Sequence, residues 1–191
     1  MSYILLFVLL MFSYLLGSIQ GSYISSKYVY KDTKVLSDWQ EYKSVHTFSR
    51  ERVWVVFIDG VKVLIPVLLL FLIAPILSLD HHFAALLGGA AATLGHMYPM
   101  FHRGKGEAME AFIITSLFVS LPSSLISIGV FAFLFLIVGR KTLPFVISVF
   151  SFPVLLILFF SPTFETGIFS ILYSILIFWR QKKAVNSYLS E

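Results

Sequence analysis

The sequence predicts an all-α integral membrane protein, a single bundle of about seven transmembrane helices spanning residues 1–191. Three observations support this fold class. The composition is 58% hydrophobic and only 13% charged, with a mean hydropathy of +0.90, which is outside the usual range of soluble domains. The apolar residues form runs long enough to cross a bilayer. Basic and non-basic connections alternate between those runs, as in a multi-pass membrane protein.

The apolar runs place the individual helices. The expected spans are residues 3–24, 53–78, 83–101, 108–123, 125–139, 143–160 and 165–180. The first is predicted to be a retained helix and not a cleaved signal peptide, because it lacks a basic start and no small-x-small cleavage site precedes Gly17. The fourth and fifth share one apolar stretch, and Pro122-Ser-Ser124 is the local signal that separates them.

The distribution of Lys and Arg predicts the orientation. The odd-numbered connections and the tail hold Lys27, Lys31, Lys34, Lys43, Arg50 and Arg52, then Arg103 and Lys105, then Arg140 and Lys141, then Arg180, Lys182 and Lys183. The three intervening turns hold neither Lys nor Arg. Because basic connections stay in the cytoplasm, we expect the N-terminus outside and the C-terminus in the cytoplasm. This alternation requires an odd number of spans, which also favours separate fourth and fifth helices.

Composition narrows the chemistry. The absence of Cys excludes disulfides, cysteine zinc sites and thiol nucleophiles. The net charge of +4 favours anionic lipids and phosphorylated substrates over nucleic acid, because too little of the chain is soluble to form a nucleic-acid-binding face. Asp80-His-His82 has no further His or Cys nearby, so it is predicted to cap a helix at the outer surface, and no metal site or cofactor is expected.

The segment Leu94-Gly-His-Met-Tyr-Pro-Met-Phe-His-Arg-Gly-Lys-Gly106 interrupts the apolar pattern with small, basic and ring residues. Its glycines, Gly104 and Gly106, allow close backbone approach, and Lys105 adds a point charge before the next helix begins. The segment therefore predicts a site for an anion such as phosphate. Residue 106 is Gly and the rest of the nucleotide P-loop pattern is missing, so ATP binding is not predicted. His96 has two interpretations, a buried core histidine or a proton-handling group.

Asp59 and Lys62 are charged residues within the second apolar run. They lie three positions apart, so they share one helix face and can neutralise each other. One interpretation is a self-satisfied ion pair with Lys62 snorkelling toward the surface. The other is that Lys62 faces a polar cavity beneath the cytoplasmic loops. Glu107 and Glu110 raise the same question, and their position at the start of a helix favours a structural role.

These residues together resemble a known family. Gly17-Ser-Ile-x-x-x-Tyr-Ile, Asp59-x-x-Lys62, Leu94-Gly-His-x-x-Pro and Gly104-Lys-Gly106 follow one another as in the bacterial acyl-phosphate:glycerol-3-phosphate acyltransferase family, the small membrane type. The resemblance implies transfer of a fatty acyl group from acyl phosphate to the 1-hydroxyl of glycerol 3-phosphate, giving lysophosphatidic acid and phosphate. It also implies a multi-pass protein of the bacterial cytoplasmic (inner) membrane, with membrane lipids as its surroundings.

The chain departs from the family pattern in four places. The family's Gly-Ser-Ile-Pro reads Gly17-Ser-Ile-Gln20. Its glycine-rich first loop falls near residues 35–47, which contain no glycine. The second signature is shortened to His102-Arg-Gly-Lys-Gly-Glu-Ala-Met, and the C-terminal signature places Ala184 where the family has asparagine.

The resemblance implies roles for particular residues. His96 and Lys105 are the candidate catalytic residues. The candidate phosphate-binding residues are Arg103, Gly104, Lys105, Gly106, Lys62, Asp59 and Ser18, with Ser37 and Ser44 standing in for the hydroxyls of the lost loop. Because the loop glycines are missing, a non-catalytic paralogue that binds lipid or a partner protein is an alternative. A small transporter is a third interpretation, although the spans offer few charged residues beyond Asp59 and Lys62.

Overall fold

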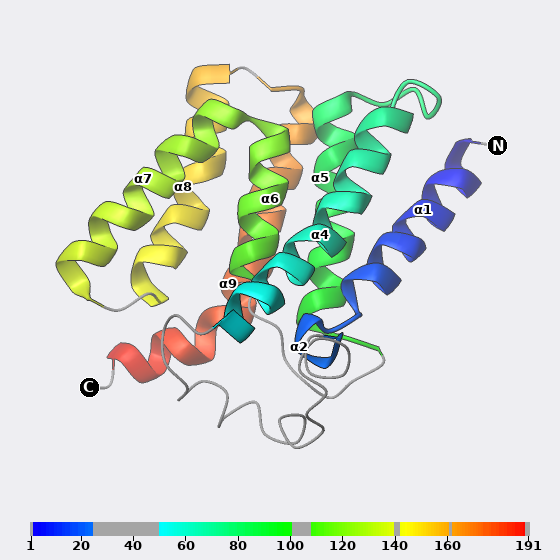
Figure 1. Cartoon of the computed structure of the whole chain (residues 1–191). Helices are drawn as coiled ribbons and strands as arrows, with labels where there is room; N and C mark the ends of the chain where they lie inside the picture. The colour runs from blue at the N-terminus through cyan, green and yellow to red at the C-terminus, as the bar shows by residue number, and fades with distance from the viewer. Residues whose placement is uncertain (1, 25–49, 101–107, 140–141, 161, 190–191) are drawn as a thin grey trace.

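The computed structural model describes residues 2–24, 50–100, 108–139, 142–160 and 162–189 (Figure 1). All regular structure in these ranges is helical, which confirms the all-α prediction. The helices are α1 (Ser2–Gly17), α2 (Gly21–Ile24), α4 (Arg50–Ile73), α5 (His81–Met97), α6 (Met109–Val119), α7 (Leu121–Val138), α8 (Thr142–Phe160) and α9 (Phe164–Leu189). Apart from the four-residue α2, the described helices are seven in number, as predicted.

The helices form one bundle with α5 and α6 near its middle (Figure 1). Helix α5 packs against α1, α4, α6 and α9, whereas α7 pairs with α8 at the far side. The start of α1 and the end of α9 lie at opposite ends of the bundle (Figure 1), as an odd number of crossings requires. The direction of insertion stays a prediction.

Length and composition identify three described helices that can cross a bilayer alone. These are Val53–Ile73, Leu121–Val138 and Thr142–Phe160, and the apolar helices Tyr3–Gly17 and Met109–Val119 are shorter. The buried share of the Leu121–Val138 span is only 17%, so most of the surface of α7 faces outward. An apolar surface of this extent is suited to contact with lipid.

Two helix boundaries bear on the predictions. The predicted helix 3–24 is wrong as a continuous element, because α1 ends at Gly17 and α2 begins at Gly21. The fourth and fifth predicted helices are confirmed as separate elements, since Ser120 between α6 and α7 is extended, with φ −161° and ψ 105°. Pro122 follows in the first turn of α7, where the N–H that proline lacks would have no intrahelical partner.

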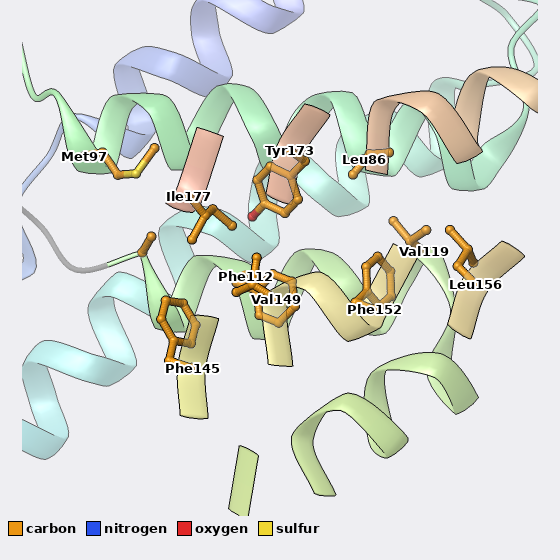
Figure 2. Close-up of a cluster of buried hydrophobic side chains, with 11 residues drawn as sticks. Leu86, Met97, Phe112, Val119, Phe145, Val149, Phe152, Leu156, Tyr173 and Ile177 are labelled. Carbon is orange, nitrogen blue, oxygen red and sulfur yellow. The ribbon is translucent and has the colours of Figure 1, made fainter. Parts of the chain in front are cut away.

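The main apolar core joins α5, α6, α8 and α9 (Figure 2). Phe112 of α6 lies at its centre, with ring centroids 6.0 Å from Phe145 and 5.9 Å from Phe152, both edge-on, and 6.3 Å from Tyr173 in a stacked arrangement. The Tyr173 hydroxyl is 2.9 Å from Thr93 Oγ1, so a buried polar contact links α9 to α5. This core makes α5 and α6 a firm support for the residues at their ends.

Candidate active site

Helices α1 and α5 approach each other unusually closely at two glycines. A Cβ on Gly17 would collide with the Ala92 carbonyl group, and a Cβ on Gly95 would collide with the Tyr14 carbonyl oxygen. Only hydrogen atoms fit between the two backbones at these points, which is the usual role of small residues in membrane helix packing. This contact brings the chain after Gly17 against α4 and the end of α5.

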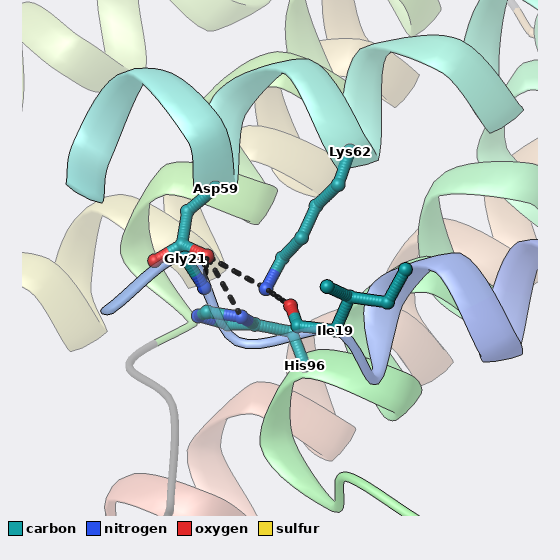
Figure 3. A network of polar contacts seen from close by, with 5 residues as sticks. All are labelled: Ile19, Gly21, Asp59, Lys62 and His96. Carbon is teal, nitrogen blue, oxygen red and sulfur yellow. Dashed lines mark hydrogen bonds and ion pairs between the residues drawn. The ribbon is translucent and has the colours of Figure 1, made fainter. Parts of the chain in front are cut away.

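Asp59 is the centre of a polar network at this junction (Figure 3). Its Oδ1 atom accepts a hydrogen bond from the Gly21 amide at 3.1 Å and lies 2.7 Å from Lys62 Nζ and 3.9 Å from His96 Nδ1. Lys62 Nζ also donates to the Ile19 carbonyl oxygen at 2.6 Å. We call Asp59, Lys62 and His96 the Asp59 cluster. It ties α4 to α5 and to the backbone between α1 and α2.

The Asp59 cluster is shielded from solvent. Asp59, Lys62 and His96 are 7%, 6% and 7% exposed, and the Lys62 ammonium group contacts two acceptors, the Asp59 carboxylate and the Ile19 carbonyl oxygen. The predicted neutralising pair is therefore confirmed, but the prediction that Lys62 snorkels is wrong, because its end is held inside the bundle. Removing either partner would leave an uncompensated buried charge, which is strongly destabilising.

Glu110 adds a second carboxylate to this environment. It lies in the first turn of α6, as predicted, where a negative charge suits the positive end of the helix. It is also close enough to Lys62 for a favourable charge interaction. Glu110 thus adds a favourable charge interaction to the ion pair that Lys62 makes with Asp59.

Ser18 and Gln20 lie in the break between α1 and α2. Ser18 is fully buried, and its hydroxyl donates to the Tyr14 carbonyl oxygen at 2.9 Å. Gln20 is 8% exposed, and its Nε2 atom has no hydrogen-bond partner. The sequence singled out Gln20 only as a departure from a family motif. A polar side chain in an otherwise small and apolar turn was the signal for a buried donor.

A second set of contacts lies beside the Asp59 cluster and was not predicted. Tyr98 follows α5, and its carbonyl oxygen accepts a hydrogen bond from the Tyr14 hydroxyl at 2.9 Å. The guanidinium carbon of Arg180 lies 5.7 Å from the centre of the Tyr98 ring, within the range of a cation–π contact. These contacts bring α1, α5 and α9 together at the start of the segment that contains Arg103 and Lys105.

Asp80 and the two histidines that follow it lie at the start of α5. Asp80 caps the first turn of α5 by accepting from the Phe83 amide at 2.9 Å, as predicted, and His81 and His82 contact the carbonyl oxygens of Phe71 and Phe118. Several predicted site residues lie outside the described residues, namely Ser37, Ser44, Arg103, Gly104, Lys105, Gly106 and Glu107. Their roles stay predictions.

Comparison with known proteins identifies the family. Residues 46–191 match the family described as glycerol-3-phosphate acyltransferase. The chain belongs to the glycerol-3-phosphate acyltransferase family. A glycerol-3-phosphate acyltransferase from Prochlorococcus marinus is 29% identical over 188 residues, which are 95% of this chain and 89% of that protein.

Solved structures agree at the level of the fold. The chain resembles crystal structures of PlsY (YgiH), an integral membrane glycerol 3-phosphate acyltransferase, in a glycerol 3-phosphate form and a lysophosphatidic acid form. The TM-scores are 0.72 and 0.76 at 23% and 24% identity, and each match covers 97% of this chain and 92% of the other. The integral membrane fold and the acyltransferase family predicted from the sequence are confirmed, whereas the transporter interpretation gains no support.

Proposed function

We propose that the protein transfers a fatty acyl group from acyl phosphate to the 1-hydroxyl of glycerol 3-phosphate at the cytoplasmic face of a bacterial inner membrane. The products are lysophosphatidic acid and inorganic phosphate. Family membership supports the class of reaction, and the related PlsY structures have glycerol 3-phosphate and lysophosphatidic acid forms. The observation that carries the proposal is the buried Asp59 cluster, which lies at the end of α5, ahead of Arg103 and Lys105 in the sequence.

The reaction needs little covalent help from the protein. The hydroxyl oxygen attacks the carbonyl carbon of the acyl phosphate, the bond from that carbon to the phosphate oxygen breaks, and the released phosphate can take up the hydroxyl proton. The protein must mainly bring two anions together and stabilise the charge that develops on them. Lys105 and Arg103 are proposed to hold the phosphate groups, with backbone amides at Gly104 and Gly106.

Other residues are assigned supporting roles in this proposal. Ser37 and Ser44 supply hydroxyl donors from the first cytoplasmic connection. His96 orients the acceptor or handles its proton, and the nearby carboxylate of Asp59 would stabilise a protonated imidazole. The grooves between the helices hold the acyl chain.

Asp59, Lys62 and Ser18 are proposed to act by positioning. Asp59 and Lys62 form a pair without net charge, so together they offer a phosphate little attraction. What they do hold is the backbone of Ile19 and Gly21, which fixes the end of α1 relative to α4. Since small errors in the placement of reacting groups cost large factors in rate, such positioning is itself a contribution to catalysis.

The test is release of inorganic phosphate from palmitoyl phosphate by the purified full-length protein in detergent or liposomes. Release is expected only when glycerol 3-phosphate is present, with lysophosphatidic acid formed in equal amount. Lys105→Ala should abolish the release, whereas Glu165→Ala, at an exposed residue in the first turn of α9, should retain it. A folded wild-type protein that releases no phosphate at any concentration would contradict the proposal and support the non-catalytic paralogue.

A further inference from the structure

Gln20 is a buried hydrogen-bond donor without an acceptor. Its side chain is 8% exposed, and Nε2 is buried and makes no hydrogen bond. Leaving such a group unpaired costs about 1–3 kcal/mol, and buried polar groups in native proteins are almost always paired. An unpaired donor next to a candidate active site therefore points to an acceptor that arrives with the substrate.

The position of Gln20 is fixed from both sides. The carbonyl oxygen of Ile19, the preceding residue, accepts from Lys62, and the amide of Gly21, the next residue, donates to Asp59 (Figure 3). The Gln20 backbone is thereby bracketed by two contacts with the Asp59 cluster. The Gln20 side chain therefore starts from a backbone position that Asp59 and Lys62 hold in place.

The charges around Gln20 indicate what the acceptor is. Among the described residues, Lys62 pairs with the Asp59 carboxylate and also interacts with the charge of Glu110, so two carboxylates offset this one lysine in an environment that disfavours a phosphate dianion. A hydroxyl group is neutral, and its oxygen accepts from an amide N–H while its proton can be donated to a carboxylate. The Gly21 amide and Lys62 both contact Asp59 through Oδ1, and His96 Nδ1 lies 3.9 Å from the same atom.

We propose that the Gln20 carboxamide donates from Nε2 to a glycerol hydroxyl of glycerol 3-phosphate and so contributes to selection of the acyl acceptor. This inference rests on the proposed function and adds to it a binding residue. The related family motif has proline at this position, which carries no side-chain donor, so the contact would distinguish this chain from that pattern.

The test is equilibrium binding of radiolabelled glycerol 3-phosphate to the purified full-length protein in detergent, with ethyl phosphate as an unlabelled competitor that lacks hydroxyls. Gln20→Met keeps the side-chain length and removes the donor. It should weaken glycerol 3-phosphate binding by about 3- to 10-fold, the range of one hydrogen bond, and leave the inhibition constant of ethyl phosphate unchanged. Unchanged glycerol 3-phosphate binding, or an equal loss for both ligands, would overturn the proposal.

A matched variant separates this effect from loosening of α1. Ser13→Ala removes another buried side-chain donor of α1, which bonds to the Leu9 carbonyl oxygen at 2.7 Å and lies about two helical turns before the junction. It should leave the affinity for glycerol 3-phosphate unchanged. Because binding is measured without turnover, a wild-type protein that binds glycerol 3-phosphate but releases no phosphate would refute the proposed function alone. A wild-type protein that does not bind it would refute both.

Discussion

The buried pair of Asp59 and Lys62 predicts a distinctive pattern of stabilities. Lys62→Met leaves the Asp59 carboxylate without its lysine, and Asp59→Asn leaves Lys62 without its 2.7 Å ion pair, with both groups only 6–7% exposed. Breaking a buried pair in this way costs about 3–5 kcal/mol, equivalent to a fall of about 6–20 °C in the melting temperature of a chain of this size. The double variant removes both charges, so it should recover most of that loss. Thermal unfolding of the four proteins in one detergent completes the double-mutant cycle.

Activity should not follow stability in the double variant. The side-chain oxygen that Asp59→Asn retains can still accept from the Gly21 amide, but Lys62→Met removes the donor that contacts the Ile19 carbonyl oxygen at 2.6 Å in the wild type. We expect kcat/KM for glycerol 3-phosphate to fall by about 10-fold or more in the double variant, because the turn after α1 is less well held. The reasoning is refuted if each single variant melts within about 2 °C of the wild type, a shift too small for a broken buried pair, or if the double variant is as active as the wild type.

Three further predictions concern the packing of the bundle. Gly95→Ala should destabilise the fold by about 1–3 kcal/mol, because the added Cβ collides with α1. In the control Gly129→Ala, the added carbon meets nothing within 4 Å, so stability should stay unchanged or rise by up to about 1 kcal/mol. Thermal unfolding measures both variants. Phe112→Ala should lower the free energy of unfolding by about 3–5 kcal/mol. The control is Phe133→Ala, on the exposed surface of α7. Equal losses of stability in the two variants would argue against the core in Figure 2. Ser148→Ala removes the 2.7 Å hydrogen bond from Ser148 to the Ser127 carbonyl oxygen, which joins α8 to α7. The loss should cost about 0.6 kcal/mol, the average for such contacts in membranes. A loss above about 2 kcal/mol in chemical unfolding would exceed the largest such contact measured and would contradict this prediction.

The helix positions could be predicted because they depend on local properties. Apolar runs of spanning length marked the helices, and Pro122 together with the alternation of basic connections separated α6 from α7. The break between Gly17 and Gly21 could not be predicted in this way. The local signal, Gly17-Ser-Ile-Gln-Gly-Ser22, is short and flanked by apolar residues on one side only, and the close approach of α1 to α5 at Gly17 is a tertiary contact that the sequence does not show.

The sequence predicted only those site contacts that join residues close together in the chain. Spacing of three residues placed Asp59 and Lys62 on one face, and the structure pairs them. The same spacing says nothing about His96, 37 positions from Asp59 by their sequence numbers, or about the backbone of Ile19 and Gly21. These groups meet at Asp59 because α1 lies against α5, so their meeting is a property of the packed bundle.

Gly21 shows how closely the junction is fitted. A Cβ at this position would lie 2.7 Å from Asp59 Oδ1 and 2.9 Å from the Val55 carbonyl oxygen, so any side chain would push the amide away from the carboxylate that it contacts. The absence of a side chain thus lets one carboxylate hold both the Gly21 amide and Lys62. A neutral, closed cluster of this kind positions the chain well but attracts anions poorly. In the proposed reaction, we therefore assign positioning to the Asp59 cluster, acceptor selection to Gln20, and the binding of the two phosphates to Arg103 and Lys105.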